Sequence, residues 1–124
     1  MNKEKLEDNL IVRITFDFAL AVMLFCDKLY ETKKLVIAGQ LLRAASSIGA
    51  NVREAQNSES IADFIHKMKL AGKEAEESEF YLLLIQKAYS YDETKALLAE
   101  LTSINKILNK IIATTKAKSK NTEA

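Results

Sequence analysis

The sequence predicts an all-α protein that folds as an antiparallel, up-and-down four-helix bundle. Its 124 residues contain no proline and only three glycines, so the residues that most often break helices are nearly absent. Apolar residues recur at spacings of three and four in four long segments, which is typical of helices with one buried face. The connections between these segments are short, which favours antiparallel neighbours. We expect one domain over residues 1–116 and a flexible, basic tail over residues 117–124, which has no apolar anchor.

The first helix is expected from about residue 5 to residue 30. Residues 18–26 of this helix are hydrophobic on every side. A helix of this kind is buried on more than one side. The core face is predicted to hold Leu6, Leu10, Ile14, Ala21 and Leu24, widened by Phe18, Val22, Phe25 and Leu29.

The second helix is expected from about residue 36 to residue 57. Small residues surround its core face and would let a neighbouring helix approach closely. The core face is predicted to hold Leu41, Ala45, Ile48, Val52 and Ala55.

The third and fourth helices are expected over about 61–89 and 93–116. Ser60 and Asp63 resemble a capping box, with a hydroxyl and a carboxylate at the start of the third helix. Residues 80–85 are again apolar on every side. The third core face is predicted to hold Ile61, Phe64, Ile65, Met68, Ala71, Ala75, Leu82 and Ile85, and the fourth Leu97, Leu101, Ile104, Leu108 and Ile111.

The apolar segments 18–26 and 80–85 predict a homo-oligomer. A single bundle buries about one stripe of each helix, so their remaining side chains would otherwise face water. A second copy of the same chain is the simplest partner.

Composition argues against several classes of protein. The net charge of +1 is unlike that of a strongly basic nucleic-acid-binding domain. Cys26 is the only cysteine, so no intrachain disulfide forms; its apolar surroundings indicate a buried hydrophobe. The N-terminus mixes both charges, and the apolar run 14–26 contains Asp17 and is shorter than a membrane span. We therefore expect a cytoplasmic protein with no membrane partner.

No residue pattern indicates catalysis, a cofactor or a metal. A di-iron bundle needs two Glu-x-x-His motifs and two further glutamates, whereas His66 is the only histidine, with Asp63 on the same helical face. We predict an exposed His66, no metal and no catalytic residue.

Two other groups of polar residues are candidates for binding. Basic residues in the second and fourth helices could contact phosphates, and we single out Arg43, Arg53, Lys106 and Lys110. Asn51, with Glu54 one turn later, flanks the core face of the second helix. A buried amide must be hydrogen-bonded, so Asn51 either joins a polar network that fixes the helix register or contacts a ligand or partner.

Residues 42–55, LRAASSIGANVREA, together with 60–78, SIADFIHKMKLAGKEAEES, resemble the signature of a bacterial family. This is the "four helix bundle protein" family, also called the 23S ribosomal RNA intervening-sequence protein family. The resemblance implies an antiparallel four-helix bundle, commonly a pentameric ring, without established catalytic residues. It also suggests a relationship to the accessory protein of diversity-generating retroelements, which binds nucleic acid and a reverse transcriptase. The nucleic-acid-binding relatives are strongly basic, whereas this chain is near neutral, which weakens the expectation of RNA or DNA binding. Arg43, Asn51, Glu54, Lys73, Glu74 and Glu77 match the signature, and fold maintenance explains the match at least as well as binding. We predict a polar network formed by Asn51, Glu54, Lys73, Glu74 and Glu77.

Two functions follow as hypotheses. The first is a non-enzymatic oligomeric scaffold that binds RNA or an RNA-associated protein. The alternative is a helical protein–protein interaction adaptor with no nucleic-acid role. A continuous positive face would favour RNA, and an exposed apolar patch within a mixed surface would favour a protein partner.

Overall fold

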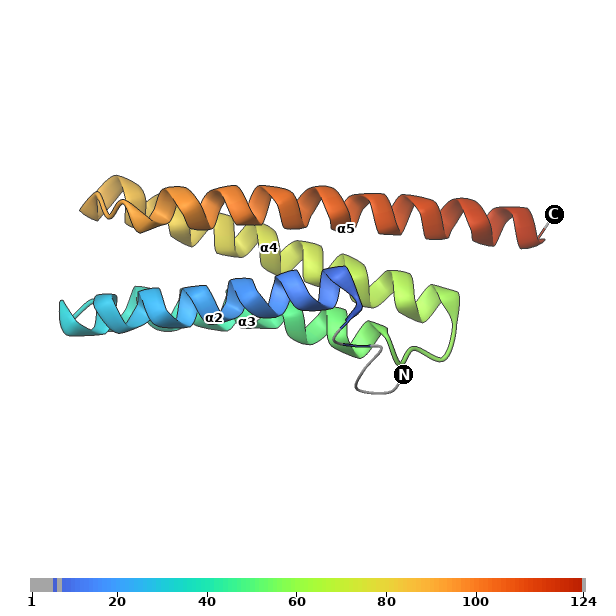
Figure 1. Cartoon of the computed structure of the whole chain (residues 1–124), viewed down its shortest axis with the longest axis horizontal. Coiled ribbons are helices and arrows are strands. Elements are labelled where there is room, and N and C mark those ends of the chain that lie inside the picture. Colours follow the sequence, from blue (N-terminus) through green and yellow to red (C-terminus); the bar gives the residue numbers. More distant parts are fainter. Residues whose placement is uncertain (1–5, 7, 124) are drawn as a thin grey trace.

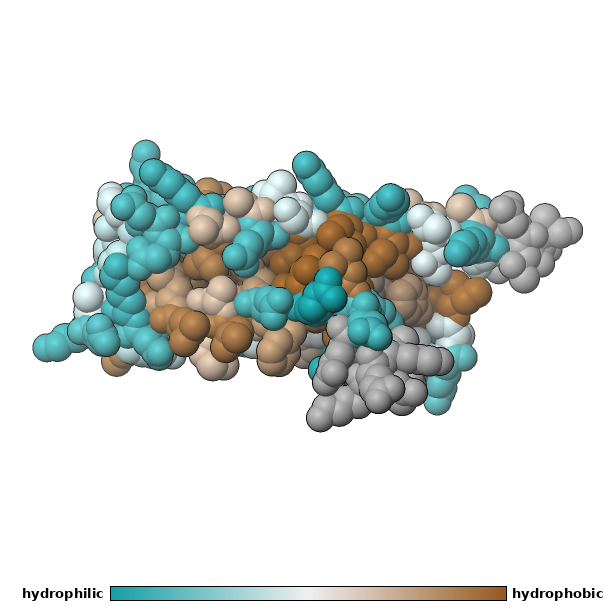
Figure 2. Space-filling model, viewed as in Figure 1, coloured by the Kyte–Doolittle hydropathy of each residue, from teal (hydrophilic) through white to brown (hydrophobic). Residues whose placement is uncertain are grey.

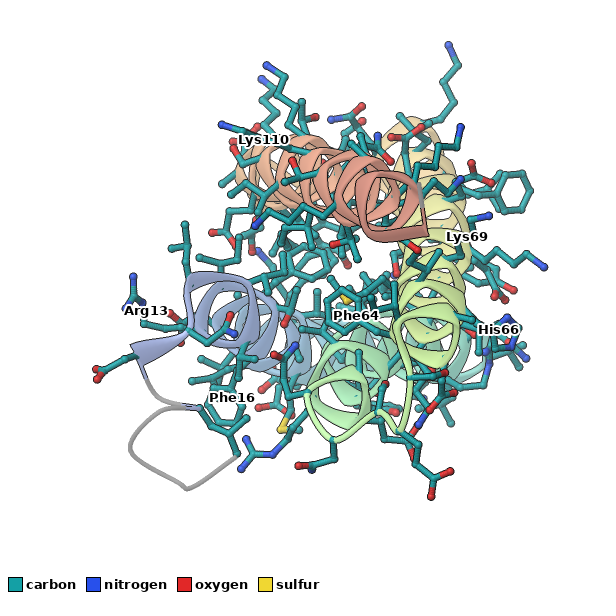
Figure 3. The ribbon with its side chains drawn as sticks, turned by 90° about the vertical axis from the view of Figure 1, so that its right-hand side faces the viewer. Arg13, Phe16, Phe64, His66, Lys69 and Lys110 are labelled. Carbon is teal, nitrogen blue, oxygen red and sulfur yellow. The ribbon has the colours of Figure 1, made fainter. Side chains whose placement is uncertain are left out.

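The structure, a computed structural model, describes residue 6 and residues 8–123. Four long helices fill this part of the chain: α2 (Leu10–Glu31), α3 (Leu35–Ala55), α4 (Ile61–Tyr89) and α5 (Glu93–Glu123) (Figure 1). Both α2 and α4 pack against α3 and α5, so α2 and α4 occupy diagonal corners of the bundle (Figure 3). The predicted all-α, up-and-down four-helix bundle is confirmed.

Local chemistry sets where the helices begin and turn. Asn9 is extended, and its side chain accepts a hydrogen bond from the backbone N–H of Val12, so α2 begins at Leu10 rather than near residue 5. Ser60 accepts a hydrogen bond from the N–H of Asp63 at 3.0 Å, as the capping signature predicts. At the other end of the bundle, Lys33 and Ser90 adopt left-handed backbone conformations, with φ of 63° and 57°, where α2 turns into α3 and α4 into α5.

The predicted core face is correct for α3, where Leu41, Ala45, Ile48, Val52 and Ala55 are all buried. It is mostly correct for α4 and α5, although Ile61 is exposed and Phe64, Ile65 and Ile111 are partly exposed. For the first helix the prediction is partly wrong: Leu10 and Leu24 are exposed, and Ile14 and Ala21 are partly exposed. The other predicted core residues are buried, namely Leu6, Phe18, Val22, Phe25 and Leu29. The buried stripe of α2 is formed by Ile11, Val12, Thr15, Phe18, Val22, Phe25, Cys26 and Leu29.

The last helix continues beyond its predicted end at residue 116. Residues 117–123 are also helical, and they contain neither proline nor glycine, the residues that most strongly disfavour a helix. They extend past the rest of the bundle in Figure 1. The expected flexibility of residues 117–124 stays a prediction about motion. Residue 124 lies outside the described residues.

One helix, α3, has the length and hydropathy that a membrane-spanning helix could also have. The core helix of a water-soluble bundle satisfies the same criteria. Leu41 and Ile48 of α3 are fully buried within this bundle. Packing in the bundle therefore accounts for the buried face of α3.

Candidate functional site

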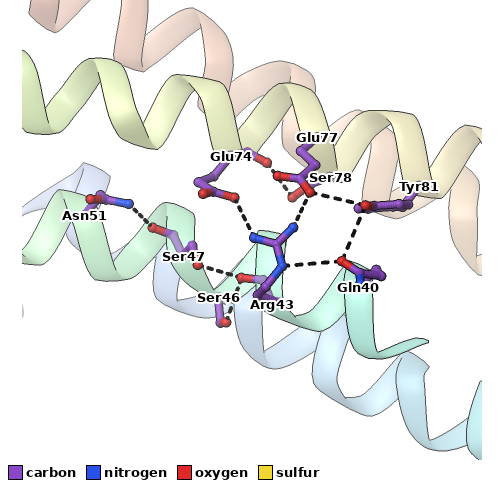
Figure 4. Close-up of polar contacts among 9 residues, drawn as sticks. All are labelled: Gln40, Arg43, Ser46, Ser47, Asn51, Glu74, Glu77, Ser78 and Tyr81. Atoms are coloured by element: carbon purple, nitrogen blue, oxygen red, sulfur yellow. Dashed lines mark hydrogen bonds and ion pairs between the residues drawn. The ribbon is translucent and has the colours of Figure 1, made fainter. Parts of the chain in front are cut away.

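The most connected polar cluster lies between α3 and α4 and is centred on Arg43 (Figure 4). The Arg43 guanidinium donates to a carboxylate oxygen of Glu77 and to Glu74 Oε2 at 3.5 Å. Its Nε donates to Gln40 Oε1 at 3.4 Å, and the Tyr81 hydroxyl donates to Glu77 Oε1 at 3.2 Å. We call these five residues the Arg43 cluster. It joins the two helices that make the most extensive contact in the bundle.

Opposing charges act on the carboxylates of the cluster. Burial, and then the neighbouring Glu77 carboxylate, raise the pKa of Glu74 above its ordinary value, while Arg43 acts in the opposite direction. A raised carboxyl pKa favours the folded state at low pH, and this contribution is lost as the pH rises through the raised value. Because Arg43 is the positive charge between them, removing it would leave the Glu74 and Glu77 carboxylates facing each other.

The structure brings together only part of the predicted polar network. Glu74 and Glu77 meet around Arg43, the residue that the sequence assigns to phosphate. Asn51 is partly buried, but its amide donates to the carbonyl oxygen of Ser47 in its own helix at 2.8 Å. Within the described residues, the side chains of Glu54 and Lys73 are exposed and form no hydrogen bond or ion pair. Asn51 is thus satisfied locally, and the cluster that crosses between helices is built on Arg43.

We expect Arg43 and Glu77 to be coupled energetically. A double-mutant cycle with Arg43→Gln and Glu77→Gln should give a favourable interaction between the two side chains, measured from urea unfolding midpoints. The matched control is the cycle with Asp92→Asn and Lys95→Gln, because this pair is 4.0 Å apart and more exposed. Equal coupling in the two cycles would contradict a stabilising role for the Arg43 cluster.

The four basic residues proposed for phosphate binding do not form one surface. Arg43 is held by carboxylates, whereas Arg53 lies exposed on α3 beside Phe16 of α2. Lys106 and Lys110 are exposed one turn apart on α5, at the corner diagonal to α3, with Lys110 pointing outward in Figure 3. Lys106 and Lys110 therefore form the pair best placed to meet phosphates together.

A second cluster, at the end of the bundle, is not predicted by the sequence. The Lys34 ammonium lies 4.6 Å from the centre of the Tyr89 ring and 5.8 Å from that of Tyr91, and the Lys28 ammonium lies 5.0 Å from Tyr91. Lys28 also pairs with Glu93 at 2.7 Å. The hydrogen bond with Thr32, and then Lys34, lower the pKa of the Tyr91 hydroxyl. These contacts tie the α2–α3 turn to the α4–α5 turn.

The described residues offer little for metal or nucleophile chemistry. Among them no three His, Cys, Asp or Glu side chains gather closely enough to hold a metal ion. His66 is exposed, as predicted, and Asp63 pairs with Lys67 at 3.2 Å. Cys26 is fully buried, also as predicted, and burial raises the pKa of its thiol to about 11. A thiol with that pKa is almost entirely protonated at neutral pH and is a poor nucleophile.

Comparisons with known proteins agree with the fold. Residues 7–110 match the family model described as 23S rRNA-intervening sequence protein. A similar solved structure, from Bacteroides thetaiotaomicron VPI-5482, is described as a protein with unknown function from the S23 ribosomal protein family. It is 36% identical in sequence with a TM-score of 0.80, and the alignment covers 82% of this chain and 97% of that chain. A comparison with curated proteins found no match.

Proposed function

We infer that this chain, which belongs to the 23S rRNA-intervening sequence protein family, is a non-enzymatic scaffold that assembles with copies of itself and binds RNA. The observation that supports assembly is apolar surface left outside the bundle. We call one such surface the α2 corner and the other the α4 ridge. The α2 corner consists of Phe16, Leu20, Met23 and Leu24, and the α4 ridge of Phe80, Leu83 and Leu84, all exposed.

Each surface groups exposed apolar side chains on one face of its helix. Single exposed apolar side chains are normal on proteins, whereas contiguous patches usually mark an interaction site. On the face shown in Figure 2, apolar residues gather along α2 and between α2 and α5. A ring of five copies is the number that the family resemblance suggests.

The RNA part of the proposal rests on charge and on the family. Lys106 and Lys110 present two adjacent positive charges on α5, and phosphate contacts of this kind supply most of the affinity in nonspecific nucleic-acid binding. Repetition of this pair around an assembly would multiply the contacts. The relationship to the retroelement accessory protein stays a prediction, and an RNA-associated protein is the alternative partner.

A titration of labelled single-stranded RNA at several salt concentrations tests this function. Replacing Lys106 and Lys110 together with glutamine should weaken binding. The slope of log affinity against log salt should fall by about 0.7 for each phosphate that the variant no longer neutralises. The control is Lys95→Gln, an exposed lysine on the same helix, which should leave the slope unchanged.

Two outcomes of this titration would count against the proposal. No binding of the wild-type protein at low salt would overturn the RNA proposal and favour a helical adaptor without a nucleic-acid role. Equal slopes for the double variant and the wild type would place the RNA contact away from Lys106 and Lys110.

A further inference from the structure

The two apolar surfaces lie on opposite corners of one bundle. The α2 corner and the α4 ridge belong to the helices that are diagonal to each other. In Figure 3, which looks along the bundle, α2 and α4 stand on opposite sides. A contact between like surfaces would cover only one of them and leave the other in water. A contact between the α2 corner of one copy and the α4 ridge of the next covers both.

Charges at the ends of the two surfaces are complementary. Arg13 precedes the α2 corner along the chain, and Asp27 follows it. Glu76 precedes the α4 ridge, and Lys87 follows it. All four side chains are exposed. When the two helices run in the same direction, Arg13 lies at the same end as Glu76, and Asp27 at the same end as Lys87.

The topology supplies that parallel direction. In an up-and-down bundle the first and third long helices run the same way, so α2 and α4 are parallel. Within one copy the α4 ridge lies nearer the α2–α3 turn than Phe16 does, because Tyr81 contacts Gln40 and Thr15 lies against Gly49. Copies that are inclined to a common axis bring the α4 ridge level with the α2 corner of the neighbour and keep α2 and α4 running in the same direction. The order of the charges along the helices therefore fits this arrangement.

Shape adds a further match. A groove of about 290 Å³ runs beside Phe16 between α2 and α3. It is lined by small residues, among them Ala19, Ser46 and Ala50, with Arg53 at its edge. Gly49 also lines it, and a Cβ there would lie 3.3 Å from the carbonyl oxygen of Thr15, so the close approach of α2 and α3 favours glycine. The groove can receive a protruding apolar side chain such as Phe80.

We propose that the α4 ridge of one copy docks on the α2 corner and its groove in the next copy, in a head-to-tail contact. This inference rests on the proposed self-assembly and adds which surfaces meet. A head-to-tail contact that closes gives a ring in which every copy uses both surfaces. The apolar side chains provide most of the binding energy, and the end charges select the parallel orientation.

Complementation of two blocked variants tests the contact. Phe16 and Phe80 are the same residue type and are 60% and 59% exposed. Phe16→Glu and Phe80→Glu should each remain helical by circular dichroism and sediment as monomers. When mixed, they should form a heterodimer, because the first retains its α4 ridge and the second its α2 corner. Val36→Glu, at an apolar residue that is 83% exposed and outside both surfaces, should assemble like the wild type.

Cysteine cross-linking gives an independent readout, because Cys26 is buried. A short bismaleimide should link the Phe16→Cys/Phe80→Cys double variant into a ladder, while each single variant stays monomeric on a denaturing gel. Cross-linked dimers of Phe16→Cys alone would show that like surfaces meet and would overturn the proposal. Assembly of Phe80→Glu like the wild type would overturn it as well. A monomeric wild-type protein would instead refute the self-assembly on which it rests.

Discussion

Replacing Phe25 with glutamate is expected to unfold the chain, whereas the same replacement at the neighbouring Leu24 leaves the helices formed. Phe25 packs in the core and makes an edge-to-face contact with Tyr91, with ring centres 5.7 Å apart. Removing a buried phenylalanine ring costs about 3–5 kcal/mol, and a buried carboxylate adds a further penalty. The total is comparable with the roughly 5–15 kcal/mol that stabilises a typical domain.

Leu24 is the matched control because it is adjacent in sequence and 63% exposed. Glutamate at this position lies outside the core of the single bundle, so the far-ultraviolet circular dichroism of Leu24→Glu should match that of the wild type at room temperature. Phe25→Glu should lose most of its helical signal or the cooperativity of urea unfolding. A folded Phe25→Glu with the urea midpoint of the wild type would contradict the assignment of Phe25 to the core.

The core face of the second predicted helix can be predicted from sequence because its large apolar residues are separated by polar or small ones. Leu41, Ala45, Ile48 and Val52 alternate with polar or small residues, so a single apolar stripe is visible. All of them are buried in α3. The capping residues Ser60 and Asp63 are also predictable, since their contact is local in sequence.

The core of α2 cannot be read in the same way. Residues 18–26 are apolar on nearly every side, so the periodicity alone does not say which stripe faces the other helices. The structure buries Phe18 and Val22 and exposes Leu20 and Leu24. The excess of apolar residues therefore obscures the core face of α2 and leaves some of these side chains exposed on the bundle.

The sequence predicts which residues belong to the candidate site but not which of them contact one another. The family signature identifies Arg43, Glu74 and Glu77, but the sequence assigns Arg43 to phosphate rather than to the two glutamates. Their pairing depends on the register between α3 and α4, which one sequence does not specify. The contacts of Lys34 with Tyr89 and Tyr91 depend in the same way on two turns that are distant in sequence.

Self-assembly of the wild-type protein is the second large effect that we expect. The seven side chains of the α2 corner and the α4 ridge are each about half exposed. Fully burying a side chain of this size contributes about 1.5–3 kcal/mol, so covering these exposed portions repeatedly around a closed assembly can offset the entropy lost on association. Leu24→Glu should reduce the assembled fraction while keeping its helices, because it places a charge within the α2 corner.

Light scattering coupled to size exclusion, on wild-type protein at micromolar concentration, tests self-assembly most directly. The expected result is one species whose mass is a multiple of the 13.9 kDa chain, with five copies favoured by the family resemblance. A dimer would keep an apolar contact between copies and exclude the closed head-to-tail ring. A particle of 13.9 kDa across the concentration series would contradict the proposed scaffold.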